Sequence, residues 1–132
     1  MLATLGTLPE FHEEAKTYDL RMDGGIPLGA EEVFVYVFVT TRGDGPFQRG
    51  YYELFTSHGK TKFTQFMNVA TGLGVMAVNS ANLWFPVGDG KFTVKLSHSS
   101  EDKKRSIAGK REDGDKEWSG VFVIGYRGGL KG

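Results

Sequence analysis

The chain of 132 residues is 39% hydrophobic and 13% aromatic, and its 16 basic side chains are balanced by 16 acidic ones. This length favours a single domain with a sizeable core, and the balanced charge argues against a nucleic-acid binder. No apolar run in the sequence approaches the roughly 18 residues that a membrane-spanning helix needs. Cysteine is absent, which excludes disulfides, zinc–thiolate sites and cysteine nucleophiles.

The N-terminal part of the chain predicts an arm followed by one strand. Residues 1–14 mix small, apolar and acidic side chains without a clear period, and they contain no apolar segment of a signal peptide. Alternating apolar side chains then favour a strand over Thr17–Met22, which the sequence Asp23-Gly24-Gly25 ends. We therefore expect residues 1–14 to pack on the body of the domain as an arm.

The segment Val33–Val39 reads Val-Phe-Val-Tyr-Val-Phe-Val and is apolar on both faces of an extended chain. The segment Val121–Ile124 repeats this character near the C-terminus. Continuous apolar runs are typical of strands that are covered on both faces, yet the sequence shows no good amphipathic helix to cover these two. We therefore expect other copies of the chain to cover the second face. The alternative is that the arm of residues 1–14 covers it within one subunit.

The other segments complete an all-β pattern. Glycine and proline predict a loop at 42–50 and a turn at 88–90, while dense charge predicts a solvated loop at 98–117 before a glycine-rich tail at 127–132. Short β-branched and aromatic segments between them predict strands at 51–56, 61–67, 73–78, 83–87, 91–96 and 118–126. The expected fold is one domain, 1–132, forming a two-sheet antiparallel sandwich of the jelly-roll type with eight or nine strands.

Two stretches carry a resemblance to a known family. The run Trp118–Ile124 resembles the closing strand of complement C1q-like globular domains, which share the tumour-necrosis-factor jelly roll. The passage 83–96, with its Gly-Asp turn between two strands, is similar to the passage before that strand, so the resemblance lies mainly in residues 83–126. It implies an extracellular trimer packed around the closing strand, often on a collagen-like stalk, that binds proteins or glycans and catalyses no reaction.

The apolar strands and the resemblance both point to an interface between copies of the chain. Burial of one large apolar side chain is worth roughly 1.5–3 kcal/mol, and a monomer that exposed these faces would aggregate. We expect a homo-oligomer, as a trimer, whose interface is formed by Phe34, Tyr36, Phe38, Trp118, Phe122 and Ile124.

A second set of residues consists of candidates for ligand binding. Aromatic rings near glycine-rich loops suit stacking on sugars, so the alternative function is a small oligomeric lectin that uses Trp84, Asn79, Asn82, Tyr51 and Tyr52. These aromatics equally suit a core or an interface. Arg42 and Asp44 flank Gly43 in the tripeptide that many integrins read, and turn chemistry explains the same three residues.

Patterns for catalysis and metal binding are weak. The histidines His12, His58 and His98 lie far apart without the spacing of a nucleophile elbow or a metal site, so we expect no enzyme, with a β-sandwich hydrolase as the third alternative. Asp113 and Asp115 could contribute oxygens to a Ca²⁺ site, but the spacing of an EF-hand is missing. We therefore expect no cofactor.

Overall fold

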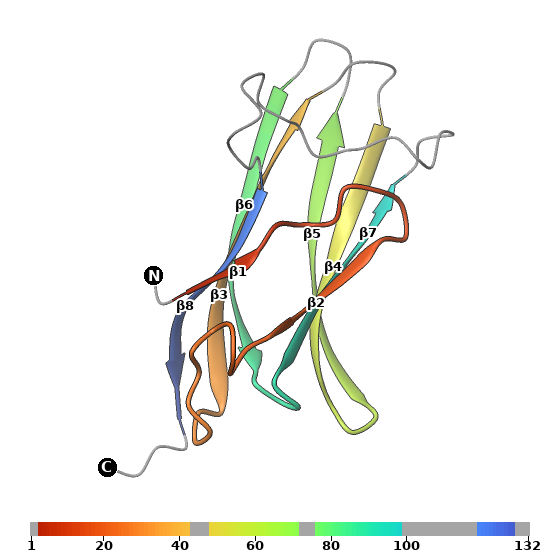
Figure 1. Ribbon diagram of the computed structural model, residues 1–132. Helices are drawn as coiled ribbons and strands as arrows, with labels where there is room; N and C mark the ends of the chain where they lie inside the picture. The colour runs from red at the N-terminus through yellow and green to blue at the C-terminus, as the bar shows by residue number, and fades with distance from the viewer. Residues whose placement is uncertain (1–2, 43–47, 72–75, 99–118, 129–132) are drawn as a thin grey trace.

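The computed structural model describes residues 3–42, 48–71, 76–98 and 119–128. These residues form eight strands, which are shown in Figure 1. In chain order the strands are β1 (Ala3–Gly6), β2 (Ala15–Asp19), β3 (Glu32–Arg42), β4 (Gln48–His58), β5 (Thr61–Thr71), β6 (Met76–Pro86), β7 (Lys91–His98) and β8 (Ser119–Arg127).

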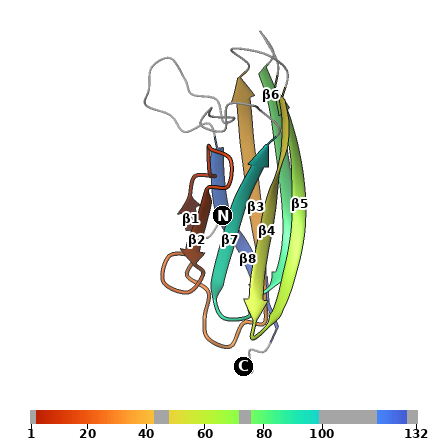
Figure 2. The ribbon, with the colours of Figure 1, turned by 90° about the vertical axis from the view of Figure 1, so that its right-hand side faces the viewer.

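The strands make two four-stranded sheets, ordered β1-β8-β3-β6 and β2-β7-β4-β5, in which all the paired strands are antiparallel. The first sheet is called sheet A here and the second sheet B. The two sheets face each other as the layers of a sandwich (Figures 1 and 2). Among the eight described strands, β4 and β5 are the only consecutive pair in the same sheet. Every other pair of consecutive strands is divided between the two sheets. This topology confirms the predicted two-sheet antiparallel sandwich.

The two-residue period of an extended chain divides the apolar run of β3 between the two faces of sheet A. Its four valines, Val33, Val35, Val37 and Val39, are almost completely buried between the sheets. They pack in one core with side chains from both sheets, the largest of which are Tyr52, Phe85, Phe92, Leu54 and Leu96. The aromatic residues that alternate with these valines therefore lie on the outer face of sheet A.

The N-terminal segment packs on the body of the domain and contributes a short strand, β1, that the sequence did not predict. β1 pairs with β8 at the edge of sheet A, and β2 pairs with β7 in sheet B. Between them Leu8 is fully buried, its N–H donates to Ser119 Oγ at 2.9 Å, and the Tyr52 hydroxyl donates to the carbonyl of Pro9 at 2.8 Å. Residues 7–14 thus cross from one sheet to the other along an edge. Their described part does not cover the outer face of sheet A. The structure therefore does not support the alternative in which residues 1–14 cover this face within one subunit.

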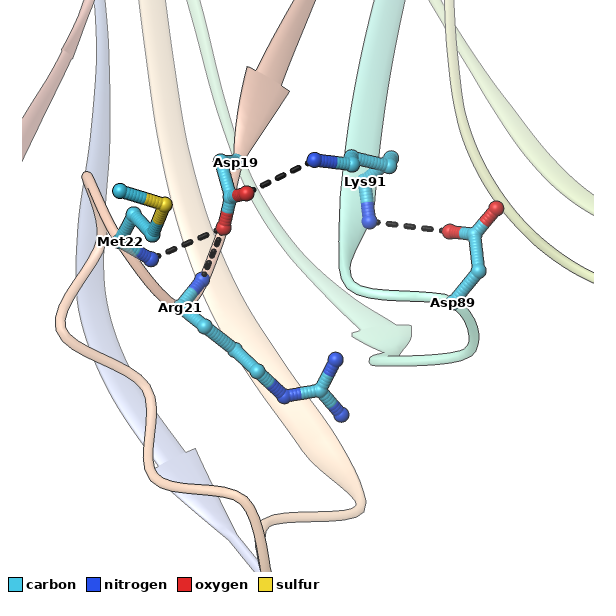
Figure 3. A network of polar contacts seen from close by, with 5 residues as sticks. All are labelled: Asp19, Arg21, Met22, Asp89 and Lys91. Carbon is cyan, nitrogen blue, oxygen red and sulfur yellow. Dashed lines mark hydrogen bonds and ion pairs between the residues drawn. The ribbon is translucent and has the colours of Figure 1, made fainter.

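The expected strand at Thr17–Met22 is wrong at both ends, because β2 runs from Ala15 to Asp19. Asp19 ends it by holding a turn. One oxygen of its carboxylate accepts the N–H groups of Arg21 and Met22 at 2.9 and 2.8 Å, and the other accepts the Lys91 ammonium at 2.7 Å (Figure 3). Met22 consequently lies outside the sheet with 85% of its surface exposed.

This turn predicts a dependence of stability on pH. The hydrogen bond from Lys91, together with those from the backbone of Met22 and Arg21, lowers the pKa of Asp19 from 3.8 to about 2. The ionised carboxylate therefore stabilises the fold above pH 3.8, and this contribution is lost as the pH falls through about 2. We expect Asp19→Asn to lower the melting temperature by about 2–4 °C at pH 7, and the difference from wild type to disappear towards pH 2.

Thermal unfolding followed by circular dichroism between pH 2 and pH 7 measures this difference. Asp23→Asn is the matched control, because Asp23 lies in the same turn and is exposed. A loss that stayed constant from pH 7 to pH 2 in Asp19→Asn would contradict an origin in the carboxylate charge.

The described parts of two predicted strands, 73–78 and 83–87, belong to one continuous strand, β6, and residues 73–75 lie outside the described residues. With the additional strand β1, the described residues form eight strands. The polar sequence Asn79–Asn82 is extended because β6 pairs with β3 in one unbroken register from Glu32 opposite Pro86 to Arg42 opposite Met76. Pairing with a long neighbour overrides the weak strand propensity of these residues. β4 likewise begins at Gln48, inside the expected loop 42–50. Within the described segments there is no helix with the length and apolarity to cross a membrane.

Candidate functional site

The outer face of sheet A carries a continuous layer of large apolar side chains, which we call the aromatic face. Tyr36 of β3 lies opposite Phe122 of β8, and Phe34 lies opposite Trp84 of β6. All of its members are half-buried by their neighbours and open on their outer side. The aromatic face consists of Phe34, Tyr36, Phe38, Trp84, Phe122 and Ile124.

The rings of the aromatic face are closely parallel. Tyr36, Phe38 and Phe122 form a triangle with ring centroids 6.0–6.1 Å apart and interplanar angles of 8–28°. Phe34 and Trp84 stack at 4.6 Å and 16°. Such stacked pairs stabilise one another beyond their buried area. The face is therefore a flat and ordered surface rather than a set of separate side chains.

Gly120 of β8 gives two of these rings the space that they occupy. A Cβ atom at this position would lie 2.6 Å from the ring of Phe38 and 2.7 Å from the ring of Phe122. The rings thus fold over the backbone of β8 where no side chain stands. The sequence shows a glycine before the apolar segment 121–124, but it does not show that the rings of Phe38 and Phe122 occupy the space beside this glycine.

An ion pair closes one end of the aromatic face. Arg127 Nε donates to Glu32 Oε1 at 2.9 Å, and the Arg127 guanidinium lies 4.0 Å over the ring of Trp84. The hydrogen bond lowers the pKa of Glu32 and raises that of Arg127, so both groups are charged near neutral pH. Their opposite charges compensate, and this end of the face presents no net charge. Sequence reasoning did not find this pair, which is 95 residues apart in the chain.

The structure divides the predicted ligand residues among separate places. Trp84 and Asn82 belong to the outer face of sheet A, where the indole already contacts Phe34 and Arg127. Asn79 donates its amide to the backbone carbonyl of Asn68. Tyr52 is fully buried in the core and offers no surface to a ligand. Its neighbour Tyr51 is exposed on the outer face of sheet B, so these five residues do not form one site.

Several predicted site residues lie outside the described segments, namely Asp44, Asp113, Asp115 and Trp118, and Arg42 is described only as the last backbone position of β3. Two histidines that are distant in sequence come together, because the His98 N–H donates to His12 Nδ1 at 3.1 Å and the rings lie 5.2 Å apart. Over residues 3–42, 48–71, 76–98 and 119–128 there is no group of three or more histidine and carboxylate side chains that could hold a metal ion.

Fold and face together define a class of protein, an eight-stranded two-sheet β sandwich with an aromatic outer face on one sheet. A scan of the sequence against protein-family models and a search of curated proteins found no match.

Proposed function

We propose that the protein is a non-enzymatic recognition and assembly module whose copies associate through the aromatic face. The observation that carries this proposal is the layer of six large apolar side chains that is half-exposed in one protomer. None of the described segments lies over it, since β1 extends sheet A at its edge and residues 7–14 run from there to the edge of sheet B, with Leu8 buried in the core.

Covering this face completes the burial of six large apolar side chains in each protomer. Full burial of one large apolar side chain contributes roughly 1.5–3 kcal/mol. The six side chains are already partly buried by their neighbours, so association would add a fraction of this value for each of them. A soluble protein that leaves such a patch open risks aggregation, whereas a closed symmetric assembly removes the patch from water. The face therefore supports association more strongly than it supports a monomer.

The charges favour a second copy of the chain as the partner. The six members of the aromatic face are uncharged, the Glu32–Arg127 pair beside them is compensated, and the chain has a formal net charge of zero. Identical copies can thus approach face to face without net repulsion. The resemblance of residues 83–126 to C1q-like domains supports a trimer, an extracellular location, and protein or glycan ligands.

The lectin alternative finds little support at Trp84. A sugar that stacked on Trp84 would have to compete with Phe34 and Arg127 for the indole. The same contacts make Trp84 a rigid part of the aromatic face. Assembly is for this reason the function that the geometry at Trp84 favours.

Sedimentation equilibrium over a concentration series tests the proposal. We expect a particle with three times the 14.6 kDa mass of the chain, with dissociation only on dilution. A dimer would keep the association and remove the trimer. A monomer at every concentration up to the millimolar range would remove both.

A further inference from the structure

A shallow cavity of about 360 Å³ opens on the outer side of sheet B, at the end where β4 begins and where β5 and β7 end. It is distinct from the aromatic face, which belongs to the other sheet. The described residues that line it are Arg49, Gly50, Tyr51, Asn68, Ser97 and His98.

Tyr51 is the central aromatic residue of this cavity. Tyr51 is 41% exposed, and its ring meets the ring of Phe66 at 5.6 Å and 74°, so that Phe66 holds it edge to face. The pairing register places Asn68 of β5 on one side of Tyr51 and Ser97 of β7 on the other. An exposed ring therefore lies between an amide and a hydroxyl on one face of the sheet.

We propose that this cavity binds a saccharide ring. An aromatic ring with a polar tip offers a flat surface for the apolar C–H face of a sugar at small cost in conformational entropy. The amide of Asn68 both donates and accepts hydrogen bonds, and the hydroxyl of Ser97 does the same, which matches the hydroxyl groups of a sugar. The cavity volume lies at the small end of the range of roughly 300–1,000 Å³ for ligand pockets.

The position of Tyr51 within sheet B favours a compact ligand over an extended peptide. β4 is paired on both sides, with β5 and with β7, so its backbone offers no open edge for an added strand. Recognition at Tyr51 itself therefore comes from side chains, while Asn68 on one side of it belongs to the edge strand β5. One ring that stacks on Tyr51 and reaches Asn68 and Ser97 satisfies this condition.

The inference deepens the proposed function and rests on it only for multivalency. Association through the outer face of sheet A leaves the outer face of sheet B open in every copy (Figure 2). A trimer would present three cavities, and their combined binding to a surface rich in glycans would exceed the binding of one. Binding of a free oligosaccharide to one cavity requires no association.

An array of neutral and acidic oligosaccharides, probed with the full chain, tests the proposal first. We expect binding to one saccharide class, and the neutral and acidic arms then distinguish whether the Arg49 guanidinium contributes. Titration of the strongest binder as a free oligosaccharide, followed by NMR, measures the affinity of a single cavity. Failure of the wild-type chain to bind any saccharide would overturn the inference.

Variants then localise the binding. We expect Tyr51→Ala and Asn68→Ala each to weaken it at least tenfold, and Tyr51→Phe, which keeps the ring, to retain most of it. Tyr126→Ala is the matched control, because Tyr126 is a tyrosine of nearly the same exposure, 38%, in the other sheet. Equal losses in Tyr51→Ala and Tyr126→Ala would overturn the assignment.

Sedimentation of the same variants separates this inference from the proposed function. Tyr51→Ala should sediment as the wild type does, since Tyr51 lies outside the aromatic face. A monomeric wild-type chain that still bound the free oligosaccharide would contradict the assembly and support the cavity. An associated chain that bound no saccharide would support the assembly and contradict the saccharide site.

Discussion

Phe38→Lys is expected to convert the assembled protein into a monomer. Phe38 is one corner of the triangle that it forms with Tyr36 and Phe122, and it is partly exposed in one protomer. A lysine there would place an ammonium group in the interface of every copy, where an unpaired charge is expensive to bury. Each of the three copies would also lose the contacts of the Phe38 ring. We therefore expect the association constant to fall at least about a thousandfold, which is roughly 4 kcal/mol.

The measurement is the sedimentation mass at concentrations at which the wild type is associated. Phe66→Lys is the matched control, because it makes the same change at an exposed phenylalanine on the outer face of sheet B. We expect Phe66→Lys to keep the wild-type mass. Thermal unfolding of both variants checks that each is folded. An associated and folded Phe38→Lys protein would contradict the role of the aromatic face.

The fold class could be predicted because its signals are local. The alternation of valine and aromatic residues in Val33–Val39 requires that the two kinds of side chain lie on opposite faces of one strand. Sequence also shows the tight turn at Gly88–Gly90 before β7. The sequence does not show that β3 is eleven residues long, because this length depends on pairing with the whole of β6.

The pairing of the N-terminal segment with β8 could not be predicted for a different reason. Leu5, Leu8 and Phe11 indicate that the segment packs on the domain, but the local pattern does not show that Leu8 becomes fully buried while Phe11 stays exposed. The position of Leu8 depends on Ser119, 111 residues later, and on the Tyr52 hydroxyl that binds the next residue's carbonyl. Contacts over such sequence distances are set by the topology of the sandwich.

The candidate ligand residues show the same division. Tyr51 and Tyr52 are adjacent in a strand, so the two-residue period places them on opposite faces, and only Tyr51 is exposed. That separation could have been deduced from the sequence. The separation of Trp84 from Tyr51 could not, because it depends on which sheet each strand joins.

Gly120→Ala is expected to destabilise both the fold and the association. The added Cβ would meet the rings of Phe38 and Phe122 at 2.6 and 2.7 Å, distances that side chains do not tolerate. The rings must therefore shift from their stacked positions, or the backbone of β8 must move away from β3. Because the ring tips lie on a partly exposed face and can swing outward, the overpacking costs about 1 kcal/mol in the free energy of unfolding, the low end of the usual range, which chemical denaturation measures. The displaced rings should also weaken the trimer in sedimentation.

Gly125→Ala is the control that isolates this contact. Gly125 lies in the same strand and opposite Phe34 on the same face, but a Cβ there would approach no atom closer than the Cβ of Phe34 at 3.7 Å, an ordinary contact. The alanine should fit without displacing a ring and change stability little. Because both variants remove one glycine from β8, the lost flexibility of the unfolded chain is the same in each. A difference between them thus reports the space that Phe38 and Phe122 occupy, and equal effects would show that the rings do not depend on Gly120.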